Sequence, residues 1–271
     1  HKPIHQFLAE VGYEVAHIGV DHIRVRPELR RRVRFSTWVG RGDHERYLKE
    51  RGIDPTPPEG RDAYRKRVSE WERGRWVEAA YSSVRVGRWP GGAEHYLDSY
   101  WSRRACEFLH ARHEEPFALF VYLWAPHPPL WVPEPYASMF DPSRLDLPDN
   151  VGRPAENEPP GRRRSVPAQL AEQVTEEQWR RVWAAHLGLV RLADAAIGRI
   201  LETLEASGQA EGTLTVFTVD HGDHLGQHGM YQKMEMYEQA LRVPWLIRIP
   251  GGKSRRFDEP VSHLDVMPTL M

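Results

Sequence analysis

The segment 213–239, TLTVFTVDHGDHLGQHGMYQKMEMYEQ, gathers histidines, acidic side chains and one lysine directly after an apolar run. Asp220 and His221 follow that run at once, and a carboxylate oxygen together with an imidazole nitrogen can bind one divalent cation. Gly222 beside them allows the backbone to turn sharply or to approach a ligand closely. An aspartate at this point can also simply cap the following turn, so both interpretations of Asp220 stay open.

Three further residues could act on a bound anion. Lys233 lies in YQKMEMYEQ, where a lysine near a metal can neutralise an oxyanion, although most lysines are solvated surface residues. His127 stands between two prolines at the end of another apolar run, and a rigid histidine there suits general acid catalysis or is simply a turn residue. His22 follows a third apolar run and is the weaker candidate of the two histidines.

The elements that must position these groups are apolar strands separated by amphipathic helices. The strands are expected at 13–20, 116–130, 213–219 and 244–251, and the helices at 94–112 and 176–207, with Gly208 as the C-terminal cap of the second helix. Apolar strands that do not alternate predict a mostly parallel sheet that is covered on both faces, a three-layer α/β/α fold. Because ligands bind at the carboxyl ends of such strands, we expect His22, His127 and the pair Asp220–His221 to converge.

Composition narrows the class of protein. The 271 residues carry 37 Lys and Arg against 38 Asp and Glu, so charge gives no indication of a nucleic-acid or anionic-membrane partner. No run approaches the ~18 apolar residues that a membrane span needs. One cysteine excludes an internal disulfide. Compartment and oligomeric state stay open.

The segment 24–95 is rich in Arg and Trp and is interrupted by Pro and Gly, so we expect an irregular, partly helical insertion within one domain that spans 1–271. This insertion and residues 130–180 are expected to shape the substrate pocket. Their aromatic and arginine content suits stacking on sugars and contacts with anions.

At this point the motifs resemble a known family. VFTVDHGDHLGQHG followed by QKMEMYEQALRVPWLIRIPG is similar to the sulfatase family of the alkaline phosphatase superfamily, whose members typically read DHG, LG.HG, K..MYE and RVP in this order. FLAEVGYEVAHIG, PHPPLWVPEPY and VSHLDVMPTLM match as well. The resemblance covers residue 4 to the end of the chain, least well at 24–95, and implies an alkaline-phosphatase-like fold.

The resemblance implies a role for each matching residue. Asp220 and His221 would be the second pair of ligands to one divalent cation, usually Ca²⁺, with Mn²⁺ or Mg²⁺ in relatives. Lys233 would bind the sulfate oxygens. His127 would contact the ester oxygen and help to protonate the leaving group. His22, which follows the family's GK.H segment, would orient the nucleophile.

Two departures from the family pattern qualify these roles. GK.H reads GVDH here, so Val20 replaces a lysine and Asp21 adds negative charge; loss of such an oxyanion stabiliser typically costs ~10²–10³ in rate. The family's nucleophile segment, C/S-x-P-S-R, does not occur in the chain. We expect that segment, with its formylglycine, and the first pair of metal-binding acidic residues upstream of His1. The chain is then a partial catalytic domain, incomplete at both ends and inactive alone.

The function predicted for the parent protein is metal-dependent hydrolysis of a small-molecule or carbohydrate sulfate ester. Two alternatives remain. One is a phosphodiester or phosphonate monoester hydrolase of the same superfamily, and the other is a non-catalytic member that binds sulfated ligands.

Overall fold

The computed structural model describes residues 2–270. Its helices are α1 (Ile4–Glu10), α2 (Leu29–Arg32), α3 (Arg41–Glu50), α4 (Leu97–His110), α5 (Val166–Leu170), α6 (Glu176–Ala206), α7 (Glu238–Leu241) and α8 (Val266–Leu270). Its strands are β1 (Glu14–Gly19), β2 (Thr37–Val39), β3 (Arg65–Glu72), β4 (Arg75–Ser82), β5 (Val86–Arg88), β6 (Phe117–Tyr122), β7 (Leu130–Val132), β8 (Thr215–Thr218), β9 (His224–Leu225), β10 (Tyr231–Gln232) and β11 (Trp245–Arg248). The mixed α/β class that the sequence predicts is confirmed.

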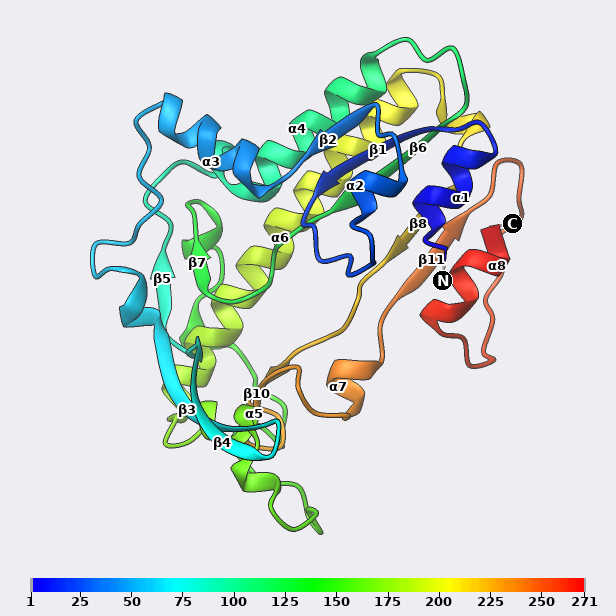
Figure 1. Cartoon of the computed structure of the whole chain (residues 1–271). Helices are drawn as coiled ribbons and strands as arrows, with labels where there is room; N and C mark the ends of the chain where they lie inside the picture. The colour runs from blue at the N-terminus through cyan, green and yellow to red at the C-terminus, as the bar shows by residue number, and fades with distance from the viewer. Residues whose placement is uncertain (1, 271) are drawn as a thin grey trace.

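A parallel sheet of order β2-β1-β6 lies beside the long helices α4 and α6 (Figure 1). In its register His17 of β1 lies between Trp38 of β2 and Phe120 of β6. β1 is buried from Val15 onward, as expected for a strand of β-forming residues in the middle of a parallel sheet. The parallel arrangement of these strands agrees with the prediction.

The two predicted long helices are present with nearly the predicted bounds. α6 begins at a capping box in which the Thr175 hydroxyl accepts from the Gln178 backbone N–H at 3.2 Å. It ends before Gly208, whose φ of 73° satisfies the left-handed position of a helix C-terminus. α4 packs along α6, and Trp101 and Leu189 are fully buried in the core that they share.

β8 and β11 differ from the expectation of one covered parallel sheet. They form a separate antiparallel pair, with Thr218 opposite Trp245 (Figure 1). Phe217 and Leu246 are 37% and 59% exposed, and β6 is half-buried along its whole length, so burial on both faces is wrong for these strands. Within residues 2–270, β6 pairs only with β1 and β8 only with β11, which leaves the second edge of each strand unpaired.

The segment 24–95 is more regular than the sequence predicts. It contributes β2 to the central sheet and contains α3 and an antiparallel hairpin, β3–β4, with eight residues in each strand. The hairpin turns at Arg73 and Gly74, which both have positive φ, as a tight two-residue turn requires. Arg-Gly is not one of the dipeptides that usually mark such a turn, so local sequence gave little indication of it.

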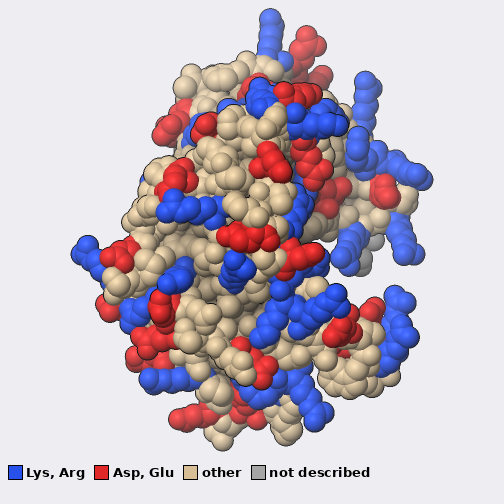
Figure 2. Space-filling model, turned by 90° about the vertical axis from the view of Figure 1, so that its left-hand side faces the viewer, with Lys and Arg blue, Asp and Glu red and all other residues tan. Residues whose placement is uncertain are grey.

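Lys, Arg, Asp and Glu side chains are interspersed over the face drawn in Figure 2, without a continuous field of one sign. No helix among the described residues is both long and apolar enough to cross a bilayer.

Candidate active site

The loop after β6 is held in place by a buried carboxylate. Asp98 lies in the first turn of α4 with no exposed surface, and its Oδ1 accepts from the backbone N–H groups of Trp124 at 2.7 Å and Ala125 at 3.1 Å. Burial raises the pKa of Asp98 to about 6, against the effect of the two N–H donors. The sequence analysis did not single out this residue, because an acidic side chain in the first turn of a helix is normally explained by its favourable interaction with the helix dipole.

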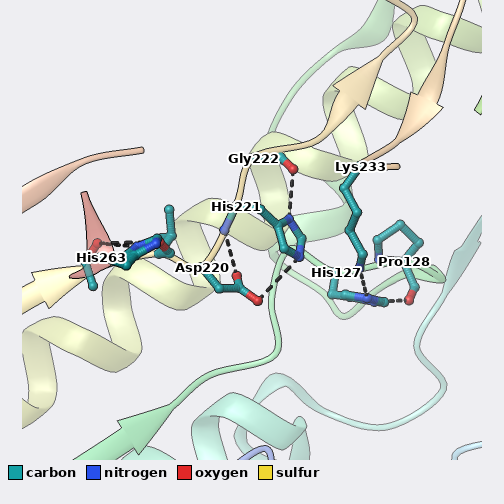
Figure 3. Close-up of polar contacts among 9 residues, drawn as sticks. His127, Pro128, Asp220, His221, Gly222, Lys233 and His263 are labelled. Carbon is teal, nitrogen blue, oxygen red and sulfur yellow. Dashed lines mark hydrogen bonds and ion pairs between the residues drawn. The ribbon is translucent and has the colours of Figure 1, made fainter. Parts of the chain in front are cut away.

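That loop presents His127 to Lys233. Lys233 Nζ donates to His127 Nε2 at 2.6 Å, and His127 Nδ1 donates to the Pro128 carbonyl at 2.5 Å (Figure 3). The imidazole is therefore neutral, with a hydrogen on Nδ1 and a lone pair on Nε2. Burial, followed by the charge of Lys233, lowers the pKa of His127 to about 4. The Trp124 ring packs on the imidazole, with the ring centroids 4.0 Å apart.

Asp220 and His221 form a second pair at the end of β8. The His221 Nδ1–H donates to the Gly222 carbonyl at 2.8 Å, and His221 Nε2 lies 3.4 Å from Asp220 Oδ2 (Figure 3). Asp220 Oδ1 accepts from the His221 backbone N–H at 3.0 Å. No helix begins after Asp220, since residues 221–223 are irregular and β9 follows, so Asp220 is not the N-cap of a helix, although its carboxylate does accept from the next backbone N–H.

Gly222 fixes this segment against α7. A Cβ at this position would lie 2.0 Å from the Gln239 carbonyl oxygen, and the Gly222 N–H donates to the Ala240 carbonyl at 2.9 Å. Only glycine allows this contact, so the expected close approach is present, although the partner is the protein's own backbone.

Asp223 is a second residue that the sequence reading missed. Its Oδ1 is shielded from solvent and has no hydrogen-bond partner among residues 2–270. Burial raises the pKa of Asp223 to about 6, while the charges of Lys233 and His221 act in the opposite direction. The second aspartate of the DHGD motif was the one feature of the sequence that could have drawn attention to it.

The structure brings four of the five predicted residues together. The charges of His221 and Asp220 act on the pKa of His127, and Figure 3 shows the two pairs side by side. His22 is exposed and lies outside this group of four, with its ring centroid 6.4 Å from that of Trp124. Trp124 thus contacts both histidines.

A family model described as Sulfatase matches residues 1–271. The chain belongs to the sulfatase family. It is 30% identical over 244 residues to an arylsulfatase of Clostridium perfringens, covering 84% of this chain and 50% of that protein. It is 28% identical to the uncharacterized sulfatase YidJ of Escherichia coli, covering 74% of this chain and 44% of that protein.

Among solved structures, the phosphonate monoester hydrolase SpPMH from Silicibacter pomeroyi aligns with a TM-score of 0.62 at 27% identity, covering 89% of this chain and 51% of that one. The fold is that of the alkaline phosphatase superfamily, as the motifs imply. The chain spans about half or less of the length of these relatives.

The residues present fit one side of the metal site that the sulfatase family uses. Asp220 Oδ2 and His221 Nε2 lie 3.4 Å apart at the end of β8, and a carboxylate oxygen together with an imidazole nitrogen can bind one divalent cation. No group of three or more His, Cys, Asp or Glu side chains suited to a metal occurs within the described part of the chain. These residues would therefore supply two ligands of a larger coordination shell.

Proposed function

We propose that the protein containing this chain hydrolyses sulfate esters with the help of a divalent cation. The observation that carries the proposal is the contact of Lys233 with His127, beside the pair Asp220–His221. These four side chains come from two segments that are 106 residues apart at the Lys–His contact. Together they offer positive charge, a proton and cation ligands to one bound anion.

Each side chain has a distinct task in the proposed reaction. Lys233 binds a sulfate oxygen through its ammonium group, which stabilises charge that develops on the sulfate. Asp220 and His221 hold the cation, proposed to be Ca²⁺ with Mn²⁺ and Mg²⁺ as alternatives. The cation supplies Lewis-acid stabilisation and orients the ester.

His127 handles the proton of the leaving group. In the substrate-free site it is neutral and accepts from Lys233. The negative charge of a bound sulfate raises the pKa of His127, so that Nε2 takes up a proton from solvent and then gives it to the ester oxygen as the bond from that oxygen to sulfur breaks. In this proposal the nucleophile is a formylglycine outside residues 1–271, and His22 orients it.

The test uses the full-length protein, stripped of metal with a chelator and then reloaded with Ca²⁺, Mn²⁺ or Mg²⁺ in turn. We expect release of 4-nitrophenol from 4-nitrophenyl sulfate that depends on the added metal. A peptide mass for formylglycine in the full-length chain accompanies the assay. Full activity without metal, or no metal binding that depends on Asp220, would overturn the proposal.

A phosphonate monoester or phosphodiester hydrolase is the second candidate, favoured by the likeness to SpPMH and by Val20 at the position of the family lysine. Higher kcat/KM on phenylphosphonate esters or bis(4-nitrophenyl) phosphate than on 4-nitrophenyl sulfate would select it. Tight binding of a sulfated sugar without turnover of any of these esters would instead indicate a non-catalytic member.

A further inference from the structure

Two tryptophans at the tip of the β3–β4 hairpin are exposed to solvent. Trp71 and Trp76 lie opposite each other in the register and are 59% and 51% exposed. Their ring centroids are 5.4 Å apart at an interplanar angle of 68°. Large aromatic side chains in this position leave apolar ring surface in water, which commonly marks a binding site.

The tryptophans line a groove of about 450 Å³ that continues to the segment after Lys233. Its opposite wall is the loop 159–167, and Met234 and Glu235 contribute to the same groove. Lys233 directly precedes these two residues in the chain. The groove therefore adjoins the site that we propose for the sulfate ester.

The charge at the groove favours an anionic ligand. Arg164 lines it, is exposed and makes no side-chain hydrogen bond or ion pair with any described residue. The two carboxylates of the groove are already engaged, since Glu235 pairs with Arg162 and Glu70 accepts from the Tyr81 hydroxyl at 2.6 Å. One guanidinium is thus left to bind an anion, and a guanidinium can form two parallel hydrogen bonds with a sulfate group.

The hairpin is held rigidly. The Gln169 side chain accepts from the Ser69 N–H at 2.9 Å and donates to the Ser69 carbonyl at 2.7 Å, and Lys66 Nζ donates to the Gln169 carbonyl at 2.7 Å. At the other end of β4, Gln232 donates to the Ser82 carbonyl at 2.7 Å. Because these hydrogen bonds order the hairpin before any ligand binds, binding at this groove costs little further conformational entropy in the protein.

The span from the sulfate site to the tryptophans determines the size of the ligand. Trp76 is six residues from Ser82 along the continuous strand β4, which places it roughly 20 Å from the contact with Gln232 at about 3.3 Å per strand residue. A small aryl or alkyl sulfate cannot reach both places. A chain of sugars can, and its apolar ring faces suit stacking on indole.

We propose that Trp71, Trp76 and Arg164 form a subsite for a sulfated oligosaccharide whose scissile sulfate lies at Lys233. The proposal rests on the proposed function for the position of that sulfate, and it assigns carbohydrate polymers as the substrate class. The tryptophans bind sugar rings, and Arg164 binds a second sulfate group that is not cleaved.

The test compares binding and turnover in the full-length protein. Size-fractionated dextran sulfate oligosaccharides are titrated by calorimetry into the wild type, W71A/W76A, W71F/W76F and R164A, with F257A and R112A as exposed controls. We expect the Kd to weaken about tenfold or more in W71A/W76A and R164A, to recover in W71F/W76F and to stay unchanged in the controls. Unsulfated dextran of equal length is expected to bind more weakly than dextran sulfate.

Turnover separates this proposal from the proposed function. The kcat/KM on 4-nitrophenyl sulfate is expected to be unchanged in W71A/W76A, because that ester does not reach the tryptophans. Equal dextran sulfate affinity in the wild type and W71A/W76A overturns the subsite even where 4-nitrophenyl sulfate is cleaved. Absence of sulfate-ester cleavage, with weakened dextran sulfate binding in the variants, overturns the proposed function and leaves the binding groove.

Discussion

The two halves of the candidate site are built to different degrees by this chain. The pair Lys233–His127 is half-buried, and both ring nitrogens of the histidine have a partner. The pair Asp220–His221 is open, with the Asp220 side chain 85% exposed and its Oδ2 3.4 Å from His221 Nε2. The first pair is thus connected to the rest of the described chain through both partners of the imidazole, whereas the carboxylate of the second pair is open to solvent.

This difference shows which part of the site depends on other groups. His127 and Lys233 are fixed by Asp98, Trp124 and the Pro128 carbonyl, all within the described chain. Asp220 and His221 are positioned by the backbone contact of Gly222 with α7 and by the bond of His263 Nε2 to the Val219 carbonyl at 2.8 Å, and the Asp220 carboxylate contacts only His221 among the described residues. Mutations in the two halves should therefore have different signatures.

Removing His127 should give the largest effect. For H127A in the full-length protein we expect kcat/KM to fall by about 10²–10⁴, because a general acid is lost. The loss should be larger for alkyl sulfates than for 4-nitrophenyl sulfate, whose leaving group departs without a proton. H110A, an exposed histidine at the end of α4, serves as the control. An equal loss on both esters would contradict the proton-donating role.

Removing the negative charge of Asp220 should chiefly weaken binding of the cation. D220N is nearly isosteric, and we expect it to lower Ca²⁺ affinity by at least about tenfold, because an anionic ligand becomes a neutral amide. The readout is a calorimetric Ca²⁺ titration of the chelator-treated full-length protein, with D149N as the control. Unchanged Ca²⁺ affinity in D220N would refute the assignment of this ligand.

Substitutions of Asp98 test whether the geometry of the Lys233–His127 pair depends on the hydrogen bonds that Asp98 accepts from the loop before His127. D98A leaves the buried N–H groups of Trp124 and Ala125 without acceptors, at about 1–3 kcal/mol for each. We expect a lower Tm and a reduced kcat with nearly unchanged Ca²⁺ affinity. D98N keeps an acceptor oxygen and should recover most of both quantities. A D98N variant as impaired as D98A would show that the negative charge, not the acceptor, matters.

The smallest expected effect is a loss of folding stability at acid pH. It arises from buried histidines throughout the chain, of which only His127 belongs to the candidate site. Five histidines have folded-state pKa values lowered to about 4, chiefly by burial: His5, His17, His127, His186 and His224. Between about pH 4 and 6.5 the unfolded chain binds more protons at these groups, so their contribution to stability is lost as the pH falls.

Asp98 and Asp223 act in the opposite direction over nearly the same range, because their folded-state pKa values are raised to about 6. Five groups oppose two, so we expect the Tm to fall progressively from pH 6.5 to pH 4. Calorimetric scans at half-unit pH steps measure the effect. A Tm that rises toward pH 4 would contradict the buried, neutral state of these histidines.

Several features were predictable because they depend on residues that are close in sequence. The strand that ends before Asp220, the bounds of α6 and the cap at Gly208 follow from hydrophobic periodicity and end signals. The β3–β4 hairpin was missed because Arg73 adopts positive φ without the usual turn residues. The antiparallel pairing of β8 with β11 was missed because apolar runs do not encode strand direction.

By itself, the sequence determined the family, the α/β class and the residue types that carry the chemistry, since motif order and short-range patterns are contained in the chain. Only the tertiary structure decided that Lys233 donates to His127 and that Asp98 supports the loop that leads to His127. These contacts join segments that are distant in sequence. The shifted pKa values depend in turn on burial and neighbouring charges, which exist only once the chain has folded.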